Sequence, residues 1–126
     1  MFSHVIVGTN DINAATRFYD AVMLTLGFSK GDFNAEKQRT YYRTAEGNFV
    51  VTKPIDGNPA STGNGSTIGF KCNSTEQVKA FHDIAVENGG TSIEDPPGWR
   101  TNGSNRMYLA YVRDPDGNKL NAIFRE

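Results

Sequence analysis

The feature that most constrains the fold is an order of predicted elements that occurs twice along the chain. The first half opens with a short β-branched, apolar segment, residues 3–8, which indicates a buried strand. Apolar residues then recur at gaps of three and four from Ile12 to Leu26, which is the spacing of one helix face. Two strands are predicted next, at 41–44 and 49–52, joined by a turn that contains glycine. The first half therefore predicts a strand, a helix and a hairpin.

The second half repeats this order with little identity between the two sequences. A strand is predicted at 67–72, and Ser74 to Gln77 has the spacing of a capping box at a helix start. A strand at 107–112 and a last strand at 120–124 are joined by the turn at 114–118. The carboxylates of that turn are explained by turn chemistry, because Asx side chains hydrogen-bond to their own backbone. The repeat predicts an α+β fold of two βαβββ modules.

The repeat also predicts the domain organisation. Module one covers about residues 1–53 and module two about 66–126, within a single domain spanning 1–126, because 126 residues is an ordinary domain length. Residues 54–65 between the modules are rich in proline, glycine and small polar residues, which indicates a linker or long loop. This segment is either a lid over a site or only a connection.

Composition excludes several classes of partner. The net charge is −1, from 13 basic and 14 acidic residues, and no basic stripe of the kind that binds nucleic acid is evident. No segment has the length and apolarity of a membrane span. Cys72 is the only cysteine, which excludes an internal disulfide, and the N-terminus lacks the pattern of a signal peptide. We therefore predict a cytoplasmic protein with neither nucleic-acid nor membrane partners.

Two segments resemble the signatures of a known family. The first is His4-Val5 on the opening strand, followed by Asp-Ile-Asn-Ala-Ala-Thr-Arg-Phe-Tyr at 11–19. The second is Tyr-Val-Arg-Asp-Pro-Asp-Gly-Asn at 111–118. Both are similar to the glyoxalase/bleomycin-resistance/dioxygenase superfamily, also called the vicinal oxygen chelate (VOC) superfamily, and the resemblance covers nearly the whole chain. It implies an open barrel-like cleft, usually completed in a homodimer, that binds small oxygenated molecules and commonly a divalent metal.

The resemblance also implies up to four metal-ligand positions, on the first and last strand of each module. Here these positions are occupied by His4, Val51, Thr67 and Asn121. One imidazole and one neutral amide make a poor divalent site, because catalytic zinc takes three His, Cys or carboxylate ligands and Fe(II) oxygenases two His and a carboxylate. We therefore predict no cofactor and disfavour a divalent metal, with His4 the only matching ligand position; the alternative is a metal whose other ligands come from unexpected positions.

The candidate site residues follow from the same reasoning. His4 is the candidate catalytic residue, as a general base or by orienting a ligand; the alternative is a strand residue whose ring nitrogens are satisfied by Asn121 or water. Ligand clefts are lined by apolar and aromatic side chains with a few polar groups. The expected ligand-binding residues are accordingly Tyr42, Val51, Thr67, Trp99, Tyr108 and Asn121.

These features predict a glyoxalase/bleomycin-resistance-like protein that binds a small organic ligand without the usual metal. The alternative is a metal-dependent lyase or isomerase related to glyoxalase I (lactoylglutathione lyase), with His4 as one ligand. A ring-cleaving dioxygenase-like enzyme or an interaction module are further alternatives, so whether the chain is an enzyme stays open. A homodimer is expected, because open sheets leave edges that a partner can cover.

Overall fold

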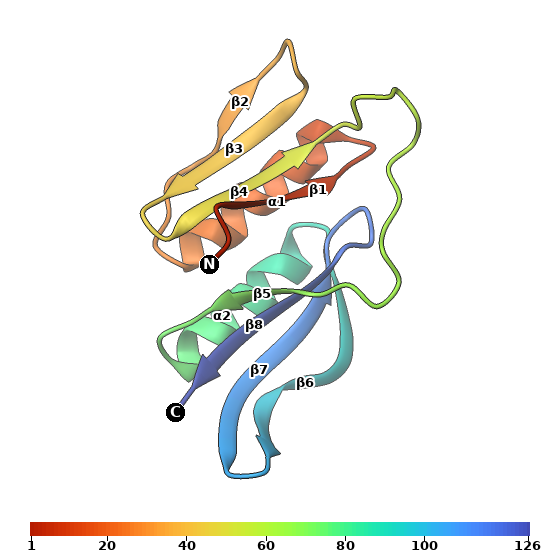
Figure 1. Cartoon of the computed structure of the whole chain (residues 1–126). Coiled ribbons are helices and arrows are strands. Elements are labelled where there is room, and N and C mark those ends of the chain that lie inside the picture. Colours follow the sequence, from red (N-terminus) through yellow and green to blue (C-terminus); the bar gives the residue numbers. More distant parts are fainter.

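Two four-stranded sheets and two helices make up the structure, a computed structural model that describes residues 1–126 (Figure 1). The elements are β1 (His4–Gly8), α1 (Ile12–Thr25), β2 (Asp32–Asn34), β3 (Arg39–Thr44), β4 (Gly47–Thr52), β5 (Ile68–Lys71), α2 (Thr75–Glu87), β6 (Thr91–Asn102), β7 (Asn105–Arg113) and β8 (Lys119–Arg125). The strand order is β1-β4-β3-β2 in one sheet and β5-β8-β7-β6 in the other. The predicted α+β fold of two βαβββ modules is confirmed, and the sheets are not closed into a barrel.

Both helices begin at side chains that cap free backbone N–H groups. The Asp11 carboxylate accepts a hydrogen bond from Ala14 N at 3.0 Å, and Ser74 Oγ accepts one from Gln77 N at 3.1 Å. The Gln77 side chain in turn accepts from Asn73 N at 2.7 Å, one residue before the N-cap. The caps therefore fix where each helix starts relative to the strand before it.

The sequence did not predict two of the edge strands, β2 and β6. β6 contains Pro96 and Pro97, residues that are typical of loops, but it lies at the edge of its sheet, where missing backbone donors are tolerated. Its pairing with β7 shifts register between Ile93 and Gly98, and Glu94 there has φ 60°. β2 is also an edge strand and has only three residues. Short or irregular edge strands give weak periodic signals, which explains why both were missed.

The segment between the modules, residues 54–65, has no helix or strand. Ala60, near the middle of the segment, is hydrogen-bonded to Asn10 of module one. Ala60 N donates to Asn10 Oδ1 at 2.7 Å, and Asn10 Nδ2 donates back to Ala60 O at 3.5 Å. Asn10 N also donates to Asp116 Oδ1 at 2.8 Å, so this one residue contacts the linker and the last turn of module two.

One hydrophobic core joins the two modules. Its 19 buried residues come from both halves, and α1 packs against α2 behind the sheets (Figure 1). Phe49 of β4 and Phe70 of β5 meet across the junction with ring centroids 5.5 Å apart. Tyr19 of α1 donates to the buried Asp114 carboxylate at 2.5 Å, which links α1 to the turn before β8. No helix of the structure has the length and apolarity needed to cross a membrane.

Candidate functional site

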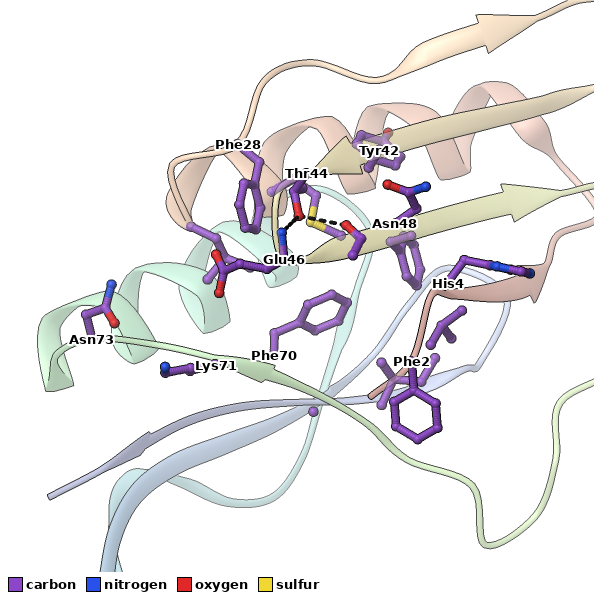
Figure 2. Close-up of a pocket in the computed structure, with 17 residues that line it drawn as sticks. Phe2, His4, Phe28, Tyr42, Thr44, Glu46, Asn48, Phe70, Lys71 and Asn73 are labelled. Carbon is purple, nitrogen blue, oxygen red and sulfur yellow. Dashed lines mark hydrogen bonds between the residues drawn. The ribbon is translucent and has the colours of Figure 1, made fainter.

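A pocket of about 230 Å³ lies at the junction of the modules, between the start of β4 and the end of β5 (Figure 2). Its inner wall is apolar and includes Met23, Phe49 and Phe70, and Figure 2 shows Phe70 between the two strands. Its rim is polar, with side chains from β1, the β3–β4 turn and the end of β5. These rim residues are His4, Thr44, Glu46, Asn48, Lys71 and Asn73.

The rim takes its shape from the β3–β4 hairpin. Thr44 Oγ1 donates to Gly47 O at 2.6 Å and accepts from Glu46 N at 3.1 Å, as the dashed lines in Figure 2 show. Gly47 has φ 132°, a conformation that L side chains rarely adopt, so glycine is required at this turn. Asn48 N donates to Ser3 O at 3.0 Å, which holds the N-terminal segment beside the hairpin. The turn thereby holds Glu46 and Asn48 at the mouth of the pocket.

The rim carries charges of both signs above an aromatic wall. Glu46 is acidic and Lys71 is basic, and neither forms an ion pair within the chain. Phe70 is supported from behind by Phe81, with ring centroids 5.5 Å apart. Such a wall offers ring faces and edges to an apolar or aromatic group, while the rim offers hydrogen bonds and charge to a polar one.

His4 lies at the rim with an exposed side chain. Its Nδ1 is 2.6 Å from Ser3 Oγ, so its partner is a neighbouring hydroxyl and not Asn121. Asn121 instead donates to Ala110 O at 3.2 Å and Ala122 O at 3.5 Å. A catalytic imidazole is usually oriented by a carboxylate or carbonyl on its second nitrogen. No carboxylate or carbonyl group hydrogen-bonds to the His4 ring.

The pairing of β1 with β4 shows that Val50, and not the expected Val51, lies on the same face as His4. β1 and β4 pair in parallel with His4 opposite Asn48 and Ile6 opposite Val50, so Val50 shares the face of His4. Val51 is on the other face, fully buried in the core. A shift of one residue exchanges the two faces of a strand, so the face that His4 occupies holds Val50 and not the expected Val51.

The residues at these positions do not fit a divalent metal. In register they are His4, Val50, Thr67 and Asn121, which together provide one imidazole and no carboxylate. Across the chain, no group of three or more His, Cys, Asp and Glu side chains is placed to hold a metal ion. No step of the chemistry is therefore assigned to a metal.

The structure brings two of the expected site residues together and separates the rest. His4 and Tyr42 line the pocket, where Tyr42 is buried and donates to Asp20 Oδ1 at 2.8 Å. Trp99 and Tyr108 pack on each other with centroids 5.3 Å apart, away from the pocket, and Arg106 stacks on Trp99 at 3.9 Å. The other three, Val51, Thr67 and Asn121, are also absent from the lining.

Sequence reasoning missed most of the lining. The missed side chains include Phe2, Phe28, Glu46, Asn48, Phe70 and Lys71. The sequence predicted the glycine-containing turn between β3 and β4. This turn was the only signal that could have pointed to Glu46 and Asn48. The other missed residues, Phe2, Phe28, Phe70 and Lys71, come from segments that are far apart in the sequence and meet only in the folded chain.

The two buried tyrosines predict loss of stability at alkaline pH. Burial is the main cause that raises the pKa of both Tyr19 and Tyr42, and the Asp114 and Asp20 carboxylates raise them further. Below about pH 10 both phenols are neutral in the folded and unfolded states, so their contribution to stability is complete. Above it only the unfolded chain loses these protons, so the free energy of unfolding falls by up to about 1.4 kcal/mol per pH unit for each tyrosine.

Urea unfolding between about pH 8 and pH 11 measures this loss. Tyr42→Phe should flatten the pH dependence, whereas Tyr41→Phe, on the half-exposed opposite face of β3, is the control and should not. A flat profile for the unmodified chain up to pH 11 would contradict the assignment.

The sequence matches the model of the Glyoxalase/Bleomycin resistance protein/Dioxygenase superfamily over residues 1–122. Together with the paired βαβββ modules, this match places the chain in that superfamily, and it belongs there along nearly its whole length. The resemblance drawn from the sequence is confirmed.

Solved structures agree with this assignment. A crystal structure of a glyoxalase/bleomycin resistance protein from Albidiferax ferrireducens is 52% identical, with a TM-score of 0.95 and 99% of each chain covered. A putative glyoxalase from Bacillus halodurans is 18% identical, with a TM-score of 0.76, covering 98% of this chain and 95% of that one. Lactoylglutathione lyase from Agrobacterium tumefaciens is 14% identical, with a TM-score of 0.65, covering 98% and 92%, and shows the fold alone. No curated protein sequence gives a significant match.

Proposed function

We propose that the chain binds a small organic molecule in the pocket between its modules, without a resident metal. The observation that carries the proposal is an aromatic wall beneath a polar rim, in a pocket that only His4 of the four metal-ligand positions lines. A site of this kind binds through shape and hydrogen bonds, because its side chains provide no ligand set for a metal that would polarise a bound oxygen. Binding or sequestration is therefore favoured over metal-dependent lyase chemistry.

The size and chemistry of the pocket limit the ligand. About 230 Å³ is below the range of roughly 300–1,000 Å³ that drug-sized ligands occupy, so the ligand is a smaller molecule. Phe28 and Phe70 favour an aromatic or otherwise apolar body. Lys71, His4 and Asn48 favour a polar or anionic end at the rim, whereas Glu46 limits how much negative charge is tolerated there.

A ligand screen with one matched pair of variants tests the proposal. Small aromatic acids and phenols are titrated by calorimetry or NMR with protein freed of metal by chelator. Phe28→Ala should weaken binding of a hit by about tenfold or more, because an aromatic contact in a desolvated pocket is worth upwards of about 1.4 kcal/mol. Phe33→Ala, a half-exposed phenylalanine on β2 outside the pocket, is the control and should bind like the unmodified chain.

The metal content of protein that has not been treated with chelator decides between the two functional hypotheses. Purified, untagged protein is expected to contain metal well below one ion per chain, and the chelator should leave ligand binding unchanged. Near-stoichiometric Zn, Ni, Mn or Fe that is lost in His4→Ala would contradict the proposal. Metal-stimulated isomerisation of a hemithioacetal would establish the lyase alternative.

We further propose a homodimer as the functional form. The support is that β2 and β6 are open edge strands with unpaired backbone groups, which a second copy can cover.

A further inference from the structure

A second cavity lies at the opposite end of β4 from the pocket. Its volume is about 490 Å³, and it is formed by the β2–β3 turn and by the first residues after β4. Three of its side chains are cationic, Lys37, Arg39 and Lys53, and one is acidic, Glu36. The surface therefore has an excess of positive charge in a chain whose net charge is −1.

The backbone holds the three cations in fixed relation to one another. Arg39 pairs with Thr52 in the β3–β4 register, and Lys53 N donates to Gln38 O at 3.0 Å. Within the turn, Lys37 N donates to Asn34 Oδ1 at 2.9 Å. Gln38 has φ 53°, a left-handed conformation. These bonds place the stems of Lys37, Arg39 and Lys53 around one hollow before any ligand binds.

The cations have no partners within the chain. None of the four ion pairs of the structure includes Lys37, Arg39 or Lys53, although Glu36 lines the same cavity. In addition, Arg39 Nε is the only side-chain nitrogen or oxygen that is buried without a hydrogen-bond partner. A guanidinium N–H that is buried without a hydrogen-bond partner raises the free energy of the folded state. An acceptor bound beside Arg39 Nε would remove this cost.

We propose that this cavity is a binding site for an oxyanion, and specifically for the phosphate group of a small soluble molecule. A guanidinium offers parallel N–H donors that match two oxygens of one phosphate, and Nε is one of those donors. Lys37 and Lys53 add two point charges that neutralise the second negative charge of a phosphate ester. Glu36 opposes binding, which limits the affinity and makes the assignment testable by charge.

The anion site is distinct from the proposed ligand pocket. The pocket includes Gly47 to Phe49 at the start of β4, and the anion site includes Lys53 just after its end. Strands rise about 3.3 Å per residue, so the four residues from Phe49 to Lys53 separate the two sites by roughly 13 Å of strand. A small molecule that fills the pocket does not extend over this distance, so the anion site binds the phosphate group of a separate molecule.

Titration of the full chain with inorganic phosphate tests the site. Chemical-shift changes in ¹⁵N-labelled protein are followed against sodium chloride at equal ionic strength. We expect changes centred on residues 35–39 and 53–55, with a dissociation constant of about 1 mM or lower. Arg39→Gln and Lys37→Gln should each weaken binding by about tenfold, because charge-assisted hydrogen bonds are lost. Glu36→Gln should strengthen it.

Arg43→Gln is the matched control. Arg43 lies on the same strand, pairs with Asp32 at 2.9 Å and does not line the cavity, so its loss should leave phosphate affinity within about twofold of the unmodified chain. Lys37 is exposed, so Lys37→Gln keeps the test valid if Arg39→Gln folds poorly. Equal effects of phosphate and chloride, equal loss in Arg43→Gln and Arg39→Gln, or binding only to vesicles of phosphatidic acid would overturn the proposal.

Discussion

Asp114→Ala is expected to lower the free energy of unfolding by about 3 kcal/mol or more. The carboxylate is 3% exposed and accepts four hydrogen bonds, from Tyr19 Oη at 2.5 Å, Asp116 N at 2.9 Å, Asn118 N at 2.9 Å and Asn118 Nδ2 at 2.8 Å. Alanine leaves the buried Tyr19 hydroxyl and three partly buried donors without this acceptor, and a buried unsatisfied donor costs about 1–3 kcal/mol. Such a loss is a large share of an ordinary domain stability of about 5–15 kcal/mol.

Urea unfolding of three further variants tests whether the loss of stability in Asp114→Ala comes from its hydrogen bond with Tyr19. Tyr19→Phe should cost about 1–2 kcal/mol, because it removes one donor and leaves the rest of the turn intact. The double variant with Asp114→Ala should cost less than the sum of the two, since they share one hydrogen bond. The control Asp95→Ala removes an exposed carboxylate and should change stability by no more than about 0.5 kcal/mol. Additive effects, or an equal loss in the control, would contradict the role of the Tyr19–Asp114 bond.

Gly90→Ala is the second change with a large expected effect. A Cβ at this position would lie 2.7 Å from Ala85 O, 3.0 Å from Arg113 O and 2.9 Å from a ring carbon of Phe18. Two of these atoms belong to backbone, which cannot move aside as a flexible side chain does. Overpacking of this kind costs about 1–3 kcal/mol, and we expect the upper part of that range.

Gly98→Ala is the control for the loss of backbone freedom. Its Cβ would meet the flexible end of Arg100 at 3.2 Å and no backbone atom closer than 3.7 Å. The free energy of unfolding should therefore change by less than about 1 kcal/mol in either direction. Thermal unfolding at one protein concentration compares the two variants, and a Gly90→Ala protein as stable as Gly98→Ala would show that the contact is not tight.

These two contacts matter for function because both hold the modules together. Tyr19 and Phe18 are on α1, whereas Asp114 and Gly90 belong to module two. The proposed ligand pocket has one wall from β1 and β4 and the other from β5, so its width depends on how the modules dock. A weakened junction is therefore expected to reduce ligand affinity even though none of these four residues lines the pocket.

Much of the fold was predictable because its signals are local. The helix starts follow from Asp11 and Ser74, whose side chains bond to N–H groups three residues later. The turn at 114–118 follows from the bonding capacity of Asp114 within five residues of chain. The match to the family then extended these local signals to a complete arrangement of two modules.

The site was less predictable, because it depends on which face each strand residue occupies. Val51 and Val50 are chemically the same, and only the pairing of β1 with β4 shows that Val50 shares the face of His4. Trp99 and Tyr108 have the composition of a ligand site, but they pack on each other and neither lines the pocket. Arg39 and Lys53 gave no signal at all, since 14 positions separate them in the sequence.

The sequence by itself therefore determined the repeated module, the helix caps, the turns and the scarcity of metal-binding side chains, because residue type and short spacing decide each of these. The tertiary structure alone decided which residues form the pocket and the proposed anion site. The physical reason is that strand register and module docking are set by contacts between distant segments, and a shift of one residue moves every side chain to the opposite face.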